Sequence, residues 1–162
     1  MKKSGYGVLF VCTGNICRSP TADGVFRKMV AKAGLEERVT VDSAGVSGWH
    51  AGEAPDQRTQ AAALGRGYDL KNLRARAVHP DDYRKFDLLL AMDRGHEETL
   101  LLNAPSAARQ RVRLFMSFAP QSNVQDVPDP YYGGPGGFEH VLDLIEAACS
   151  GLLNHVRNQL ED

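Results

Sequence analysis

The feature that most constrains the fold is a short apolar run near the amino terminus, followed after a short loop by a segment with an amphipathic pattern. Val8-Leu9-Phe10-Val11 contains no polar residue, which is typical of a central strand covered by helices on both faces. Between residues 22 and 33 the apolar residues recur at steps of three and four, which predicts a helix, and Gly34 is its expected stop. The chain therefore begins with a strand, a tight loop and a helix.

The same alternation continues to the carboxyl terminus. Further strands are expected at 39–41, 87–92 and 112–115, and further helices at 58–64, 97–102 and 138–156. Strands that alternate with helices predict an α/β fold with a parallel sheet, in which ligands bind outside the carboxyl ends of the strands. The stretch 119–137 is rich in Pro and Gly and is expected to be a long functional loop.

Length and charge narrow the class of protein. A chain of 162 residues fits one globular domain, here 1–162, since domains most often have about 100 to 150 residues. Nineteen Lys plus Arg against twenty Asp plus Glu give a net charge of −1, so we expect no nucleic-acid partner, and any anion site must be local. No apolar run approaches the roughly 20 residues of a membrane helix, so we expect no membrane association and a cytoplasmic location.

Three cysteines, an odd number, indicate a reducing compartment and need separate explanations. Cys149 falls on the apolar stripe of the last helix and is expected to be a core residue. Cys17 either packs within its loop or forms a reversible disulfide with Cys12, and the sequence leaves both open. The five histidines have no metal-ligand spacing, so we expect no metal and no other cofactor.

The loop from Cys12 to Pro20 has the composition of an anion site. A helix amino terminus offers backbone N–H groups, and a tight loop before it can fold its own N–H groups around an oxyanion. Gly14 and Asn15 are the residue types that most easily adopt the left-handed backbone of such a loop. Ser19 suits the capping position of the helix, and Pro20 suits its first helical position.

Two side chains give this loop its chemistry. Cys12 stands at the end of the strand, where the ring of N–H donors would also stabilise a thiolate. Arg18 follows six positions later, and its planar fork can hold two oxygens of a phosphoryl group. The pattern predicts phosphoryl transfer to sulfur without a metal, because positioning and fixed donors supply the catalysis.

The reaction also needs a general acid to protonate the leaving oxygen. Asp129 on the long loop is the best candidate, because Pro residues on both sides stiffen its surroundings. Tyr131 and Tyr132 are expected to form one wall for a flat substrate group, and Trp49, from a glycine-rich loop, the opposite wall.

These motifs resemble those of the low-molecular-weight protein tyrosine phosphatases of bacterial type. The signature of that family is Cys, five residues, Arg, Ser and Pro near the amino terminus, with Asp-Pro-Tyr-Tyr downstream. Here these occur as Cys12 to Pro20 and Asp129 to Tyr132. The segments Asp42 to Gly45, Arg74 to Arg76 and Ala91 to Asp93 also look like family landmarks, so the resemblance covers nearly the whole chain.

The resemblance implies a four-stranded parallel sheet flanked by helices on both faces, with the phosphate-binding loop between the first strand and the first helix. It implies a phosphocysteine intermediate on Cys12, phosphate binding by Arg18, and Asp129 as acid and then base. Asn15, Ser19 and Ser43 would hold the loop and tune the thiolate. The implied phosphate-binding loop consists of Thr13, Gly14, Asn15, Ile16, Cys17 and Ser19.

The implied partner is a phosphotyrosine-containing protein, for example a bacterial tyrosine kinase, and the implied assembly is a monomer or weak dimer. One departure concerns Leu73, which stands where the family often has a histidine that supports the loop Ser and Asn. We therefore expect the network of hydrogen bonds behind the loop to be weaker or rebuilt.

Three other functions are considered. A thioredoxin-coupled arsenate reductase shares the oxyanion loop but needs resolving cysteines, and this chain has none between Cys17 and Cys149. An arginine phosphatase tends to have Thr where Ile16 stands and a smaller residue where Tyr131 stands. A non-catalytic phosphotyrosine-binding module would be expected to lose one of the three catalytic side chains, all of which are present.

Overall fold

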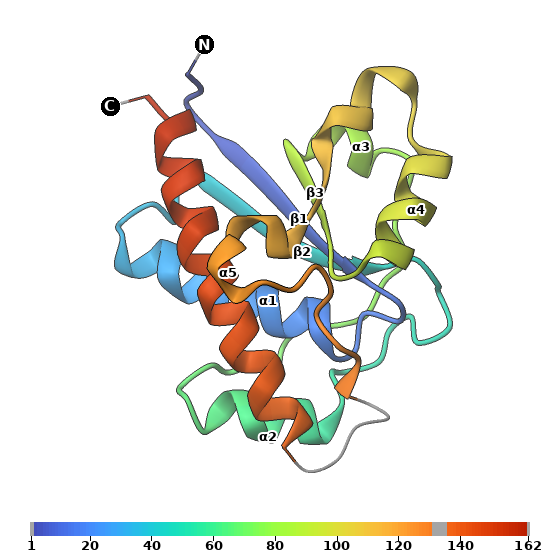
Figure 1. The fold of residues 1–162 in the computed structure, drawn as a ribbon, viewed down its shortest axis with the longest axis vertical. Coiled ribbons are helices and arrows are strands. Elements are labelled where there is room, and N and C mark those ends of the chain that lie inside the picture. The colour runs from blue at the N-terminus through green and yellow to red at the C-terminus, as the bar shows by residue number, and fades with distance from the viewer. Residues whose placement is uncertain (1, 131–135, 162) are drawn as a thin grey trace.

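The computed structural model describes residues 2–130 and 136–161, and it contains one four-stranded parallel sheet in the order β2-β1-β3-β4 (Figure 1). All four predicted strands are present. They are β1 Tyr6–Cys12, β2 Val39–Gly45, β3 Leu88–Ala91 and β4 Val112–Leu114.

The four predicted helices are also present in the described residues. The α-helices are α1 Arg18–Lys32, α2 Gln57–Leu64, α3 Asp82–Lys85, α4 Arg94–Asn103 and α5 Gly137–Gln159. Within residues 2–130 and 136–161, the 3-10 turns that accompany them include η1 Ser106–Arg111, η2 Phe115–Phe118 and η3 Pro120–Ser122. The sequence did not predict α3 or these turns, because elements this short show no hydrophobic period.

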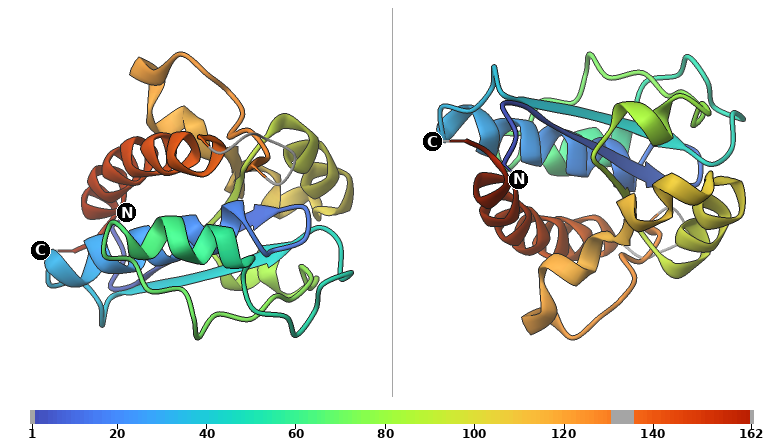
Figure 2. Two further views of the ribbon diagram at one scale, coloured as in Figure 1. Left: turned by 90° about the horizontal axis from the view of Figure 1, so that it is seen from below. Right: turned by 90° about the horizontal axis from the view of Figure 1, so that it is seen from above.

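Helices cover both faces of the sheet, which confirms the expected fold class. Alternate residues of β1 enter two different cores, since successive side chains of a strand point to opposite faces. Val8 and Phe10 pack with α1, α5 and η2, whereas Leu9 and Val11 pack with residues of α3, α4 and η1. Figure 2 shows α1 and α5 together on one side of the sheet. In the described part of the chain no helix is long and apolar enough to cross a membrane.

The sequence predicted the carboxyl end of α1 correctly but not its amino end. At the carboxyl end Gly34 has a φ of 72°, and its N–H donates to the Ala31 carbonyl, so the expected glycine stop is confirmed. At the amino end the capping residue is Cys17, not Ser19, and Pro20 is the third helical residue rather than the first, because the helix begins two residues earlier than expected. The expectation for Ser19 was wrong because its hydroxyl bonds to side chains of the preceding loop.

The strand order creates a crevice at the carboxyl end of β1. The chain passes from β1 through α1 to β2 on one side, and β3 lies on the other side of β1. The connections that follow β1 and β3 leave the sheet in opposite directions, so the loops after these two strands are separated. Open parallel sheets bind ligands in the crevice at such a point. Cys12 ends β1, and Asp93 follows β3, so both lie at this crevice.

Candidate active site

The loop after β1 has its carbonyl groups turned outward. The carbonyls of Cys12, Thr13 and Ile16 accept backbone hydrogen bonds of 2.8 to 3.0 Å from the segment between β2 and α2. No cis peptide occurs in the described residues, and in a trans peptide the N–H of the next residue points opposite to the carbonyl. The loop therefore turns N–H groups toward its centre and forms an anion nest before α1.

Asn15 fixes the shape of this loop. Its φ is 60°, so it adopts the left-handed conformation expected of it. Its side-chain amide donates to Ser19 Oγ at 2.8 Å and to Ser43 Oγ at 3.0 Å, and its Oδ1 accepts from the N–H of Arg76 at 3.0 Å. One buried amide thus joins the loop, α1, β2 and the segment before α3.

Gly14 does not adopt a left-handed conformation, so that expectation was wrong. The glycine has a different effect, which is to allow a close approach. A Cβ at this position would lie 2.7 Å from Cδ2 of His50. The absence of a side chain lets His50 pack against the loop.

The thiol of Cys12 is 3% exposed, and its Sγ lies 3.0 Å from Ser19 Oγ. Donation by this hydroxyl stabilises a thiolate. Behind the loop the backbone N–H of Arg76 holds Asn15 in place, and Asn15 in turn bonds to Ser19, while the effect of Leu73 on this network stays a prediction.

Arg18 is 4% exposed and is held by acceptors from distant segments. Its Nη1 donates at 2.9 Å to Oδ2 of Asp93 and at 2.9 Å to the carbonyl of Val127. Its Nη2 donates to Thr13 Oγ1 at 3.4 Å and lies 3.7 Å from Oδ2 of Asp129. These contacts set the guanidinium beside the loop.

Asp129 reaches the site through the long loop that the sequence singled out. Two residues before Asp129 the loop is anchored, because Val127 is buried and its N–H donates to the Met92 carbonyl at 2.8 Å. The carboxyl of Asp129 is 36% exposed, which leaves it accessible to a substrate and to water.

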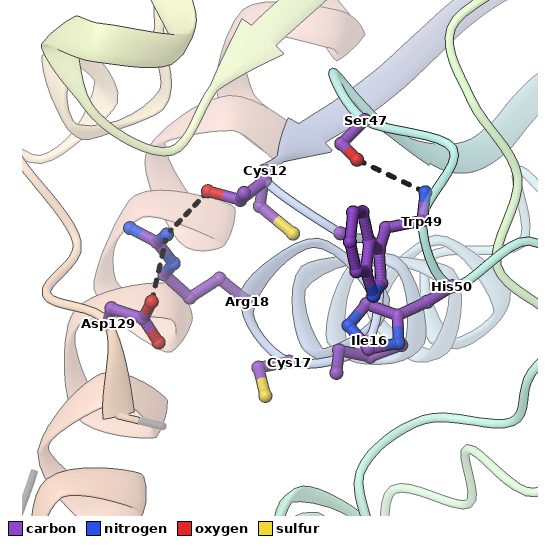
Figure 3. A pocket seen from close by; sticks show the side chains of 10 residues that line it. Cys12, Ile16, Cys17, Arg18, Ser47, Trp49, His50 and Asp129 are labelled. Carbon is purple, nitrogen blue, oxygen red and sulfur yellow. Dashed lines mark hydrogen bonds and ion pairs between the residues drawn. The ribbon is translucent and has the colours of Figure 1, made fainter. Parts of the chain in front are cut away.

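The pocket between these groups has a volume of about 430 Å³. Figure 3 shows Arg18 and Asp129 on one side of Cys12, with Trp49 and His50 on the other. Trp49 is 85% exposed, so it stands as an open wall rather than a core residue. Tyr131 and Tyr132 lie outside the described residues. The pocket is lined by Cys12, Thr13, Gly14, Ile16, Cys17, Arg18, Ser47, Trp49, His50 and Asp129.

Sequence reasoning missed several contributors to the site, among them His96, His50 and the carbonyl of Val127, and it noted Asp93 only as the end of a family landmark, without a role. Asp93 had a usable signal, because it directly follows a buried strand and precedes a helix. Its side chain accepts from the N–H of His96 at 2.9 Å and so caps α4 as well as holding Arg18. The other three had no signal, since their roles arise from contacts between distant segments.

The three thiols are free and buried. Cys149 is fully buried among α1 and α5, as expected of a core residue, and burial raises the pKa of its thiol. Burial also raises the pKa of Cys17 to about 11. The disulfide between Cys17 and Cys12 stays a prediction. Among residues 2–130 and 136–161, no three His, Cys, Asp or Glu side chains are grouped to hold a metal ion.

Comparison with known proteins agrees with this geometry. Residues 7–162 match the family model of low molecular weight phosphotyrosine protein phosphatases. The chain is 48% identical over 159 residues to a low molecular weight protein-tyrosine-phosphatase of Streptomyces coelicolor, covering 96% of each. This chain belongs to the low molecular weight phosphotyrosine protein phosphatase family.

Solved structures support the same assignment. The crystal structure of YfkJ from Bacillus subtilis superposes with a TM-score of 0.92 at 38% identity, covering 99% of this chain and 100% of that one. A protein tyrosine phosphatase from Entamoeba histolytica, crystallised with Hepes in its active site, has a TM-score of 0.92 at 36% identity, covering 95% and 98%. The recognised family and the fold therefore agree over almost the full length.

The two roles of Asn15 can be separated by substitution. Asn15→Gly removes the side-chain hydrogen bonds, but glycine adopts the positive φ without strain. Asn15→Ala removes the same hydrogen bonds and also strains the backbone at this φ. We expect urea unfolding to show Asn15→Ala less stable than Asn15→Gly by about 1 kcal/mol, the cost of a left-handed alanine. Equal stabilities would contradict a conformational role for Asn15.

The thiols should differ in reactivity. With a pKa of about 11, Cys17 is about one part in ten thousand thiolate at pH 7, and the fraction rises tenfold with each pH unit. We expect brief treatment with iodoacetamide at pH 7 to label Cys12, as read by peptide mass spectrometry, and to leave Cys17 and Cys149 unmodified. Faster labelling of Cys17 than of Cys12 would contradict the assignment.

Proposed function

We propose that this chain hydrolyses protein phosphotyrosine and small aryl phosphates through a phosphocysteine on Cys12. The observation that carries the proposal is the position of one thiol at the centre of a ring of N–H donors, with Arg18 and Asp129 beside it. Family membership supports the same activity, since the relatives are named protein-tyrosine phosphatases.

The first step transfers the phosphoryl group to sulfur. Cys12 Sγ attacks phosphorus while the bond to the leaving oxygen breaks, and Asp129 gives that oxygen a proton. Arg18 and the N–H groups of residues 13–19 stabilise the charge on the phosphoryl oxygens as it shifts. Thr13, Gly14, Asn15, Ile16, Cys17 and Ser19 are the residues to which we assign this loop.

The second step releases phosphate. Asp129, now a carboxylate, takes a proton from water as the water oxygen attacks phosphorus, and the sulfur leaves as a thiolate. Ser19 stabilises that thiolate through the 3.0 Å contact, and Ser43 supports it through Asn15. No redox partner and no metal enter these two steps.

Specificity for an aromatic ester follows from the walls of the pocket. Ile16 and Trp49 line the pocket on the side away from Asp129 (Figure 3), and a phenyl ring gains from contact with such an apolar wall. We assign Tyr131 and Tyr132 to the remaining wall. A short phosphoserine ester would not bring apolar surface to these residues.

The cellular context belongs to the same proposal. We treat residues 1–162 as one phosphatase domain that acts in the cytoplasm as a monomer or weak dimer, with a tyrosine-phosphorylated protein such as a bacterial tyrosine kinase as substrate. Three free thiols suit a reducing compartment.

Neither alternative activity is favoured. A thioredoxin-coupled arsenate reductase would need an accessible resolving thiol, and Cys149 is 0% exposed. An arginine phosphatase is disfavoured by Ile16, where those enzymes tend to have threonine.

A substrate panel tests the activity. We expect purified protein to hydrolyse phosphotyrosine peptides faster than phosphoserine or phosphoarginine peptides, with an unchanged rate in EDTA and no thioredoxin-coupled reduction of arsenate. Cys12→Ser should be inactive, because a serine hydroxyl is protonated at neutral pH. A preference for phosphoserine, inhibition by EDTA or an active Cys12→Ser variant would contradict the proposal.

The role of Asp129 predicts a dependence on the leaving group. Asp129→Ala should lower kcat/KM, which reports the transfer to sulfur, by about 100-fold or more for alkyl phosphates, because their leaving oxygen needs a proton. The kcat/KM for p-nitrophenyl phosphate should fall far less, although hydrolysis of the shared intermediate slows for both substrates. Asp126→Asn is a matched control on the same loop, because Asp126 pairs with Arg94 and not with Arg18. Equal losses of kcat/KM for both substrates in Asp129→Ala would remove Asp129 from the acid role.

A further inference from the structure

Four side chains behind the phosphate loop form a closed ring of polar contacts. Arg18 donates from Nη1 to Asp93 and from Nη2 to Thr13. Thr13 Oγ1 lies 2.8 Å from Nε2 of His96, and Nδ1 of His96 lies 3.1 Å from Oδ1 of Asp93. The ring therefore links the loop, the start of α1 and the start of α4.

His96 is neutral in this ring. It is 5% exposed, and burial lowers its pKa to about 4, so at pH 7 it has one donor and one acceptor nitrogen. The carboxylate of Asp93 can only accept, which assigns the proton to Nδ1. Nε2 then accepts from the hydroxyl of Thr13. The Nδ1 contact is too bent for a good hydrogen bond, so the contact with Thr13 is the stronger of the two.

This arrangement decides which edge of Arg18 faces a phosphate. Both hydrogens of Nη1 are used by Asp93 and by the carbonyl of Val127. A two-point contact with phosphate must therefore use the Nε and Nη2 edge. Thr13 accepts from Nη2 only while its own proton points away, toward His96. Without His96 the Thr13 hydroxyl rotates freely and no longer fixes that edge.

We propose that His96 is a positioning residue for Arg18, acting through Thr13 to orient the guanidinium edge that receives the phosphate before substrate binds. His96 does not line the pocket, so it exerts this effect without touching substrate. The inference rests on the proposed function, because it concerns the same phosphate site. A purely structural histidine would instead affect folding alone.

Binding of inorganic phosphate tests this role without requiring turnover. Trp49, the only tryptophan, lines the pocket, so a phosphate titration can be followed by its fluorescence, with NMR chemical shifts as a second readout. We expect His96→Leu to weaken phosphate binding about tenfold, the effect of losing one ordinary hydrogen bond. Thr13→Val should weaken it at least as much, because it also removes the acceptor for Nη2 of Arg18, and the double variant should bind no more weakly than Thr13→Val alone. His96→Gln should restore part of the binding, since its amide oxygen can accept from Thr13.

Two further measurements separate positioning from folding. The kcat for a phosphotyrosine peptide should fall about tenfold in His96→Leu, for the same lost hydrogen bond. Alkylation of Cys12 by neutral iodoacetamide should stay at the wild-type rate, because that reagent does not need Arg18. His155→Leu is the matched control, since burial also lowers the pKa of His155, which contacts Tyr6 at the other end of β1. It should bind phosphate like the wild type.

Wild-type phosphate binding by folded His96→Leu, or additive losses in the double variant, would overturn the role of His96. If thermal unfolding shows that His96→Leu does not fold, Thr13→Val and His96→Gln decide the question, and wild-type binding by both overturns it. Should the wild-type protein fail to hydrolyse phosphotyrosine, the proposed function fails, but the comparison of phosphate binding still tests the ring.

Discussion

The burial of one guanidinium is the interaction on which the rest of the site depends. Arg18 is 4% exposed, and a charge taken out of water is stable only when it is paired and hydrogen-bonded. Its Nη1 partners, Asp93 and the carbonyl of Val127, lie 75 and 109 residues further along the chain. The hydrogen bonds that satisfy the Arg18 guanidinium therefore bring the start of α4 and the loop carrying Asp129 to the end of β1.

The second constraint is the orientation of the peptide groups in the phosphate loop. A chain with a net charge of −1 has no general attraction for phosphate, so the positive potential must be local. The outward hydrogen bonds of the loop carbonyls and the left-handed backbone of Asn15 provide it. In the proposed mechanism the N–H groups that receive phosphate also surround Cys12, so one feature of the loop serves both anion binding and the attacking sulfur.

Local patterns predicted most of the fold, and long-range contacts account for what they missed. The apolar run before Cys12, the stripe of α1 and the stop at Gly34 are local and were confirmed. The expectation that Ser19 caps α1 was wrong. It rested on the general preference for serine at helix caps, but in the structure the Ser19 hydroxyl is held by Cys12 and Asn15. His96 gave no sequence signal, since only the packing of α4 against the loop brings it to Thr13.

The central claim is that phosphate passes through a covalent bond to Cys12. The most direct measurement is mass spectrometry of Asp129→Ala after acid quenching during turnover of p-nitrophenyl phosphate, where slow hydrolysis should let the intermediate accumulate. The account predicts an added phosphoryl group on the peptide that contains Cys12, absent from the Cys12→Ser protein. A phosphoryl group on another residue, or turnover with no adduct on Cys12 at any quench time, would contradict it.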